Sequence, residues 1–315
     1  MPSTGGTTPL LPPVAVAPLL FALPVLAMSL TFPWQGQWVC AVALIIVFGV
    51  PHGALDVEIG RTLLRHRVGW AWFPLFAVPY LALVAVVLVA WRLAPEATLG
   101  GFLLLSVWHF GAEETGSGGL PALALGGLPV ALPVLLQPAA TAEVLTAISG
   151  VLFKTPPHWL VWAGLLWLPI VIAWAARTVF LGQVRSLIVP FAAGIGFAML
   201  PPLVAFALYF VVVHAPAHTS ALIDHPTRAP RVRGPASAWW RALPTTILTV
   251  LIGAALWFVT PGEPTVRLVC VTLQLLAALT LPHMLFDAWL TRHERAKATG
   301  QHWAILDAAP NPSGS

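Results

Sequence analysis

Histidines in unusual places are the residues of this sequence that could do chemistry. Five of the ten histidines lie inside long apolar segments or at their ends: His52, His109, His214, His218 and His283. Ionisable side chains are costly in such segments, and they usually face a bundle interior and mark function. His214 and His218 are four residues apart, so one helix could offer both imidazoles to one ion. Pro216 lies between them, so we expect irregular backbone there.

Carboxylates repeat the four-residue spacing. The pairs are His52 and Asp56, His109 and Glu113, and His283 and Asp287. A metal-bound histidine commonly donates its other N–H to a carboxylate, which fixes the orientation of the ring. We therefore expect each carboxylate to orient the histidine of its own pair. The alternatives are histidines bonded to backbone carbonyls in a packed core, and carboxylates solvated at a membrane surface.

Composition places these residues in a membrane protein. The 315-residue sequence is 58% hydrophobic and only 8% charged, whereas soluble domains carry about a quarter charged residues. The net charge of +4 comes from basic residues in short loops, so it reports orientation in a membrane rather than nucleic-acid binding. Cys40 and Cys270 lie in apolar segments, which predicts buried thiols and not a disulfide.

About ten segments reach or approach the roughly 20 apolar residues that cross a bilayer. They cover residues 14–32, 37–56, 70–92, 98–113, 119–137, 157–176, 186–200, 202–222, 242–260 and 266–290. The basic loops all fall on one side of such a bundle, which predicts that both termini are cytoplasmic. All five histidines then lie at a similar depth. We predict an all-α, polytopic transmembrane domain over residues 14–297, between disordered ends at 1–13 and 298–315.

Imidazole ligands without thiolates suit zinc, copper, iron or nickel, and spacing alone does not separate these metals. The motifs "PHGALD", "WHFGAEE", "HAPAH" and "LPHMLFDAW" resemble, in content and order, those of the bacteriorhodopsin-related-protein-like family of membrane β-carotene 15,15′-dioxygenases. The resemblance runs from about the second to the tenth segment. It implies a non-haem Fe(II) enzyme of a bacterial or archaeal cell membrane. Such an enzyme cleaves the central double bond of β-carotene, or of a related carotenoid, with O₂ to give retinal.

The resemblance also implies roles for individual residues. The iron ligands would be His52, His109, His214 and His218, with His283 near the iron rather than on it. A functional link to a retinal-binding rhodopsin would follow from the product. Ala215 and Ala217 stand where the family usually has Ser and Arg, a departure that bears on the choice of carotenoid. Aromatic candidates for the wall of a substrate tunnel are Trp108, Phe110, Tyr209, Phe210 and Trp289.

Two other classes of protein fit parts of the pattern. A membrane transporter could use histidine and aspartate as an ion or proton relay. A di-iron membrane hydroxylase or desaturase would need several H-x-x-x-H clusters, whereas this sequence has one such pair. Metal analysis and turnover of a carotenoid discriminate among the three classes.

Overall fold

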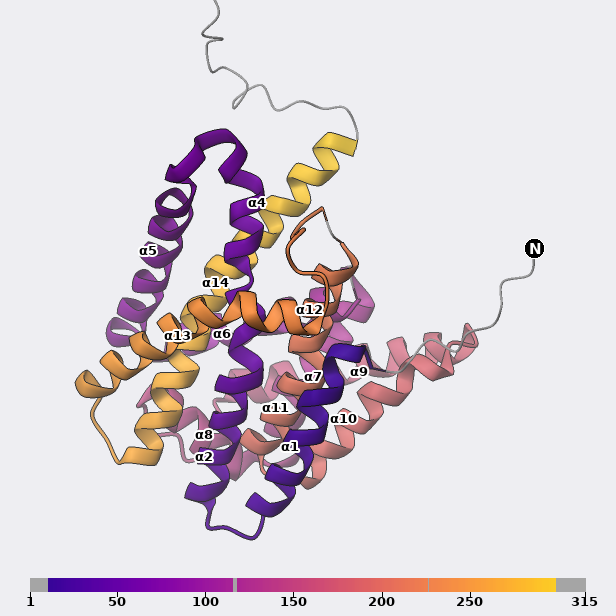
Figure 1. The fold of residues 1–315 in the computed structure, drawn as a ribbon. Coiled ribbons are helices and arrows are strands. Elements are labelled where there is room, and N and C mark those ends of the chain that lie inside the picture. The colour runs from indigo at the N-terminus through magenta and orange to yellow at the C-terminus, as the bar shows by residue number, and fades with distance from the viewer. Residues whose placement is uncertain (1–10, 116–117, 226, 299–315) are drawn as a thin grey trace, which may run out of the picture.

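Helices and the turns between them make up the whole described part of the chain, residues 11–115, 118–225 and 227–298 of a computed structural model, in which no strand occurs. The predicted all-α class is confirmed. The helices pack into one bundle, with α5 and α10 on its outside (Figure 1). Residues 1–10 and 299–315, most of the two ends predicted to be disordered, lie outside the described residues.

The α-helices of the first half are α1 (Val16–Ser29), α2 (Trp34–Leu44), α3 (Val50–Ala54), α4 (Asp56–Val68), α5 (Trp72–Leu93), α6 (Pro95–Thr115) and α7 (Leu120–Leu136). Those of the second half are α8 (Pro138–Ser149), α9 (His158–Phe180), α10 (Ile188–Met199), α11 (Pro202–Tyr209), α12 (Ala215–Asp224), α13 (Pro235–Val259) and α14 (Pro264–Ala298). Two π-helical turns, η2 (Ile45–Gly49) and η5 (Phe210–His214), join α2 to α3 and α11 to α12. Short 3₁₀ turns are η1 (Pro13–Ala15), η3 (Gly69–Ala71) and η4 (Val184–Leu187).

Length and composition mark fewer candidate membrane spans in the described residues than the ten predicted. Each of the ten predicted segments contains helix, but within the described residues five helical runs are long and apolar enough to span, or six if the bent pair α7–α8 counts as one span. One of the five is the 60-residue run Trp34–Leu93. It reverses direction after α4, where Gly69 has a φ of 57° and α5 turns back to pack on α4 (Figure 1). The count of ten is not confirmed, and the cytoplasmic position of both termini stays a prediction.

Two helices were not predicted at all. Helix α4 begins at Asp56 and carries basic residues in its last turn. Its low hydropathy is typical of a loop between membrane segments. Helix α8 is 12 residues long and bends away from α7 by 117°, so it is too short to register as a span. Hydropathy detects apolar length, and both helices lack it.

The π-helical turns lie in the centre of the bundle and share one local cause. In each, the residue after the turn donates its N–H to a carbonyl five residues back: Val50 to Ile45, and Ala215 to Phe210. A proline follows in both places, Pro51 and Pro216. A proline ring clashes with the carbonyl four residues earlier and offers no N–H, and one wider turn relieves both problems. The irregular backbone expected at Pro216 is present.

Helices α6 and α7 pack with almost no space between their backbones. A Cβ atom on Gly111 would lie 2.0 Å from the Ala122 carbonyl oxygen, and one on Gly126 would lie 1.9 Å from the Val107 carbonyl oxygen. Small residues at such crossings let membrane helices approach closely. This contact fixes the position of α6, the helix that carries His109.

Candidate metal centre

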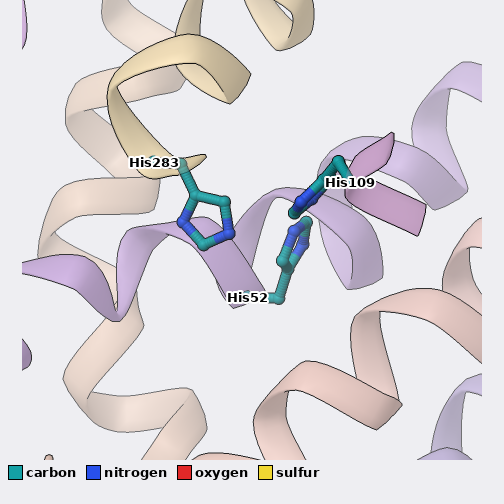
Figure 2. A group of neighbouring side chains, drawn as sticks. All are labelled: His52, His109 and His283. Atoms are coloured by element: carbon teal, nitrogen blue, oxygen red, sulfur yellow. The ribbon is translucent and has the colours of Figure 1, made fainter. Parts of the chain in front are cut away.

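The five histidines singled out in the sequence meet at one place in the bundle. They come from α3, α6, η5, α12 and α14, and each is between 0 and 6% exposed. The His214 ring lies 4.8 Å from that of His109 and 5.3 Å from that of His52, measured between centroids. The His283 ring lies 4.9 Å from His218 and 5.1 Å from His109. Figure 2 shows His52, His109 and His283 pointing toward one another from three separate helices.

Three of the rings are held through one nitrogen, which leaves the other nitrogen available. His52 Nδ1 donates to the Gly49 carbonyl at 2.5 Å. His218 Nδ1 donates to Glu113 Oε2 at 3.0 Å, and His283 Nδ1 donates to Asp56 at 2.9 Å. A metal-binding histidine is commonly oriented in this way, by a carbonyl or carboxylate on its outer nitrogen. In each of these rings Nε2 is therefore the atom able to bind a metal.

The remaining nitrogens support a metal rather than a self-contained hydrogen-bond network. His218 Nε2 and His283 Nε2 are buried and have no hydrogen-bond partner among the described residues. His109 Nε2 and His214 Nε2 lie 3.2 Å apart, and two imidazole nitrogens bound side by side to one ion at about 2.1 Å are separated by about 3 Å. Buried polar atoms rarely lack partners, so the donor set fits a metal ion bound by imidazoles.

Two overlapping groups of ligand atoms have metal-site spacing. One ligand atom from each of His52, His109 and His283 lies within 4.8 Å of the other two. The same holds for Asp56, His218 and His283.

The carboxylates contact histidines of other helices, so the prediction that each orients the histidine of its own pair is wrong. Glu113 contacts His218 and Asp56 contacts His283. For α6 the reason is register: His109 lies beside His214, so Glu113, one turn later, lies beside His218, also one turn later. For Asp56 the reason is the break at Leu55, which separates α3 from α4.

Asp287 also has a different partner from the one expected. Its Oδ1 lies 3.4 Å from Nη1 of Arg228, and the same guanidinium bonds Glu294 at 2.6 Å. Arg228 comes from the loop after α12, so this ion pair ties that loop to α14. Among the described residues no hydrogen bond or ion pair joins Asp287 to His283, and the partner of Asp287 is Arg228.

Tyr80 is a residue beside the histidines that the sequence analysis overlooked. The chain has two tyrosines, and both donate to carboxylates beside the cluster. Tyr80 donates to Asp56 Oδ2 at 3.0 Å, and Tyr209 donates to Glu114. A rare polar group inside an apolar run could have identified Tyr80 as a member of the site.

An apolar cavity of about 250 Å³ adjoins the histidines. His52, His109 and His283 line it, together with Phe110 and Phe210, which were expected there. The other three aromatic candidates lie elsewhere. Trp108 and Trp289 are 65% and 40% exposed, and Tyr209 is turned toward Glu114. None of these three lines the cavity, so their predicted place in its wall is not confirmed.

The cavity reaches the outer surface of the bundle and adjoins two further cavities. Phe73, Leu81 and Leu248 line it and are 48%, 43% and 45% exposed, so it opens between α5 and α13. It shares Phe102, Ser106, Phe110 and Phe206 with a second cavity of about 100 Å³. It shares Val50, Thr249, Leu276 and Leu279 with a third of about 320 Å³. The three apolar cavities therefore lie side by side, and the histidines line the first of them.

A bundle of apolar helices, with a buried group of histidines facing an apolar cavity, is compatible with a membrane protein that holds a metal ion. Comparison with known proteins makes the class specific. The family described as beta-carotene 15,15′-dioxygenase matches residues 43–291, which include all five histidines. The chain therefore belongs to the β-carotene 15,15′-dioxygenase family.

Two relatives agree with this membership. The chain is 28% identical over 287 residues to a protein of Halobacterium salinarum described as probable β-carotene 15,15′-dioxygenase Blh, covering 80% of this chain and 83% of the relative. It is 26% identical over 272 residues to the β-carotene 15,15′-dioxygenase of uncultured marine bacterium 66A03, covering 80% and 94%. No solved structure matches significantly. The transporter and the di-iron hydroxylase are not favoured.

Proposed function

We propose that this chain binds Fe(II) through His52, His109, His214 and His218, and cleaves the central double bond of β-carotene, or of a related carotenoid, with O₂ to give retinal. The observation that carries the proposal is the group of five buried histidines beside an apolar cavity, in which two of the proposed ligands, His52 and His218, are held through Nδ1. Iron is supported by the donor set, since imidazoles without thiolates suit it and leave coordination positions open. Family membership supplies the reaction.

The protein's own groups orient the ligand histidines and keep water away from the substrate. Glu113 holds the His218 proton on Nδ1, and the Gly49 carbonyl does the same for His52, so that both rings present a neutral Nε2. The apolar cavity excludes water and positions the polyene beside the histidines. Bound iron would supply the activation of O₂. The C=C bond and the O–O bond break and two C=O bonds form, so the atoms balance without a reductant.

The opening between α5 and α13 supports entry of the substrate from the bilayer. Exposed Phe73, Leu81 and Leu248 would meet lipid there, and a carotenoid dissolved in lipid could pass between them without entering water. We propose a location in a bacterial or archaeal cell membrane, in keeping with the sources of the two relatives. We also propose that the retinal product serves a retinal-binding rhodopsin.

The departure at Ala215 and Ala217 bears on which carotenoid is used. Ala215 lines a further cavity of about 400 Å³, which reaches His52 from the side of α1 and α13. A small apolar side chain in this wall leaves space that a larger polar one would fill. We therefore include carotenoids related to β-carotene among the proposed substrates.

The test is anaerobic loading of the purified protein with Fe(II) or Zn(II), followed by β-carotene and O₂, with retinal measured by chromatography. We expect retinal only from the Fe(II)-loaded protein. His214→Ala should lose both iron and product, whereas His66→Ala, at an exposed position of α4, should keep both. An Fe(II)-loaded protein that yields no cleavage product, or a fully active His214→Ala variant, would contradict the proposal.

A further inference from the structure

His283 is the histidine that both candidate ligand groups share. One group joins it to His52 and His109, and the other joins it to His218 and Asp56. From this position we propose that His283 is itself a ligand of the metal, held in place by a relay of Asp56 and Tyr80. The proposal rests on the metal centre of the proposed function. It revises the expectation that His283 lies near the iron rather than on it.

The ring of His283 is oriented as a metal ligand would be. Its Nδ1 lies 2.9 Å from both oxygens of Asp56, so the ring is anchored on its outer side. Its Nε2 is buried and has no hydrogen-bond partner among the described residues. The ring points toward His52 and His109 (Figure 2). This arrangement of carboxylate, outer nitrogen and free inner nitrogen is the usual one for a histidine on a metal.

Tyr80 extends the anchor to a third helix. Its hydroxyl donates to Asp56 Oδ2 at 3.0 Å, and Asp56 is 2% exposed. Tyr80 on α5, Asp56 at the start of α4 and His283 on α14 thus form one chain of hydrogen bonds directed at the cluster. Such outer partners hold a ligand in its binding orientation, and their loss commonly weakens metal binding.

A purely structural ion pair between His283 and Asp56 explains less. If His283 were doubly protonated, its Nε2–H would be a buried donor without an acceptor in the described part of the chain, which is costly. The nearby arginines do not replace a metal either. Arg228 pairs with Asp287 and Glu294, and Arg231 lies near Glu58. The two carboxylates that contact the histidines, Asp56 and Glu113, carry charges that a dication would offset.

The test compares metal binding by His283→Gln, Tyr80→Phe and wild-type protein, using Co(II), whose visible absorption reports the number and type of its ligands, and Fe(II) in competition with a chelator. We expect His283→Gln to bind both metals at least 10-fold more weakly and to change the Co(II) spectrum. Tyr80→Phe removes only the hydroxyl and should weaken binding by about 10-fold, with a spectrum close to wild type. His66→Ala is the control and should match wild type in both measurements.

The outcomes separate the two proposals. Wild-type protein that binds neither metal contradicts the metal centre and with it the proposed function. Wild-type protein that binds Co(II), together with a His283→Gln variant of unchanged affinity and spectrum, overturns only the assignment of His283. Folding is controlled by His283→Gly with added imidazole. Recovery of the wild-type spectrum supports direct ligation, and a spectrum that imidazole does not change counts against it.

Discussion

Replacing Gly111 by alanine tests whether the contact between α6 and α7 holds the metal centre together. The new Cβ would lie 2.0 Å from the carbonyl oxygen, 2.6 Å from the carbonyl carbon and 2.9 Å from Cα of Ala122. All three obstacles are backbone atoms, so no side chain can rotate away. Helix α7 has little freedom to yield, because the Trp167 ring of α9 packs directly on Gly127 and donates to the Leu123 and Ala124 carbonyls.

The size of the effect follows from these distances. The two helices must separate by roughly 1 Å. Overpacking of this kind lowers the free energy of unfolding by about 1–3 kcal/mol, and we expect the upper end of this range because the backbone must move. His109 lies two residues from Gly111, and metal–ligand distances tolerate only about 0.2 Å of error. Gly111→Ala should therefore lose thermal stability and bound metal together.

The assay is thermal unfolding of the detergent-purified protein, combined with metal content per chain. Gly101→Ala is the matched control, since Gly101 is on the same helix and a Cβ there would meet nothing within 4 Å. We expect this control to equal or slightly exceed wild type in stability, because alanine favours helix by up to about 1 kcal/mol over glycine. A Gly111→Ala variant that behaves like Gly101→Ala in both measurements would refute the reasoning.

Three further predictions concern the site. Glu113→Gln keeps the shape but removes the charge beside His218, so metal affinity should fall by about 10–100-fold in chelator competition; unchanged affinity would contradict its role. Chelation of the bound metal should lower the unfolding temperature, and adding the metal back at 100 times its Kd should restore about 2.7 kcal/mol of the free energy of unfolding. Equal stability with and without metal would argue against the metal centre. Ser106 lines two of the cavities, so Ser106→Phe should narrow both and abolish β-carotene cleavage while metal stays bound. Leu104→Phe on the same helix, at a site 68% exposed, should remain active, and equal loss in both variants would rule out this substrate path.

Sequence reasoning succeeded where residue type and apolar length carry the information. Histidines such as His214 and His283 stand out because an imidazole inside an apolar run needs a partner, and the structure does bring these residues together. The apolar segments likewise mark where helices lie. Length alone does not show whether a helix crosses the bilayer, as the turn at Gly69 and the bend between α7 and α8 make clear.

The spacing of residues along the sequence does not predict which residues meet across two helices. A four-residue interval shows that Glu113 and His109 share a face of α6, but the register against α12 decides that Glu113 contacts His218. Aromatic residues were misplaced for a different reason. In lipid, the outer and inner faces of a helix are both apolar, so the hydrophobic periodicity of the sequence does not distinguish exposed Trp108 from buried Phe110.

The two π-helical turns make the metal site sensitive to the length of the chain as well as to its chemistry. Each turn accommodates one residue more than an α-helical path would. Deleting a single residue from Ile45–Gly49 would let that turn close into α-helix and would rotate everything after it by about 100° relative to α2. His52 would then leave the cluster although no ligand had been changed. Insertions and deletions in these two turns should therefore be tolerated far less than substitutions of the same residues.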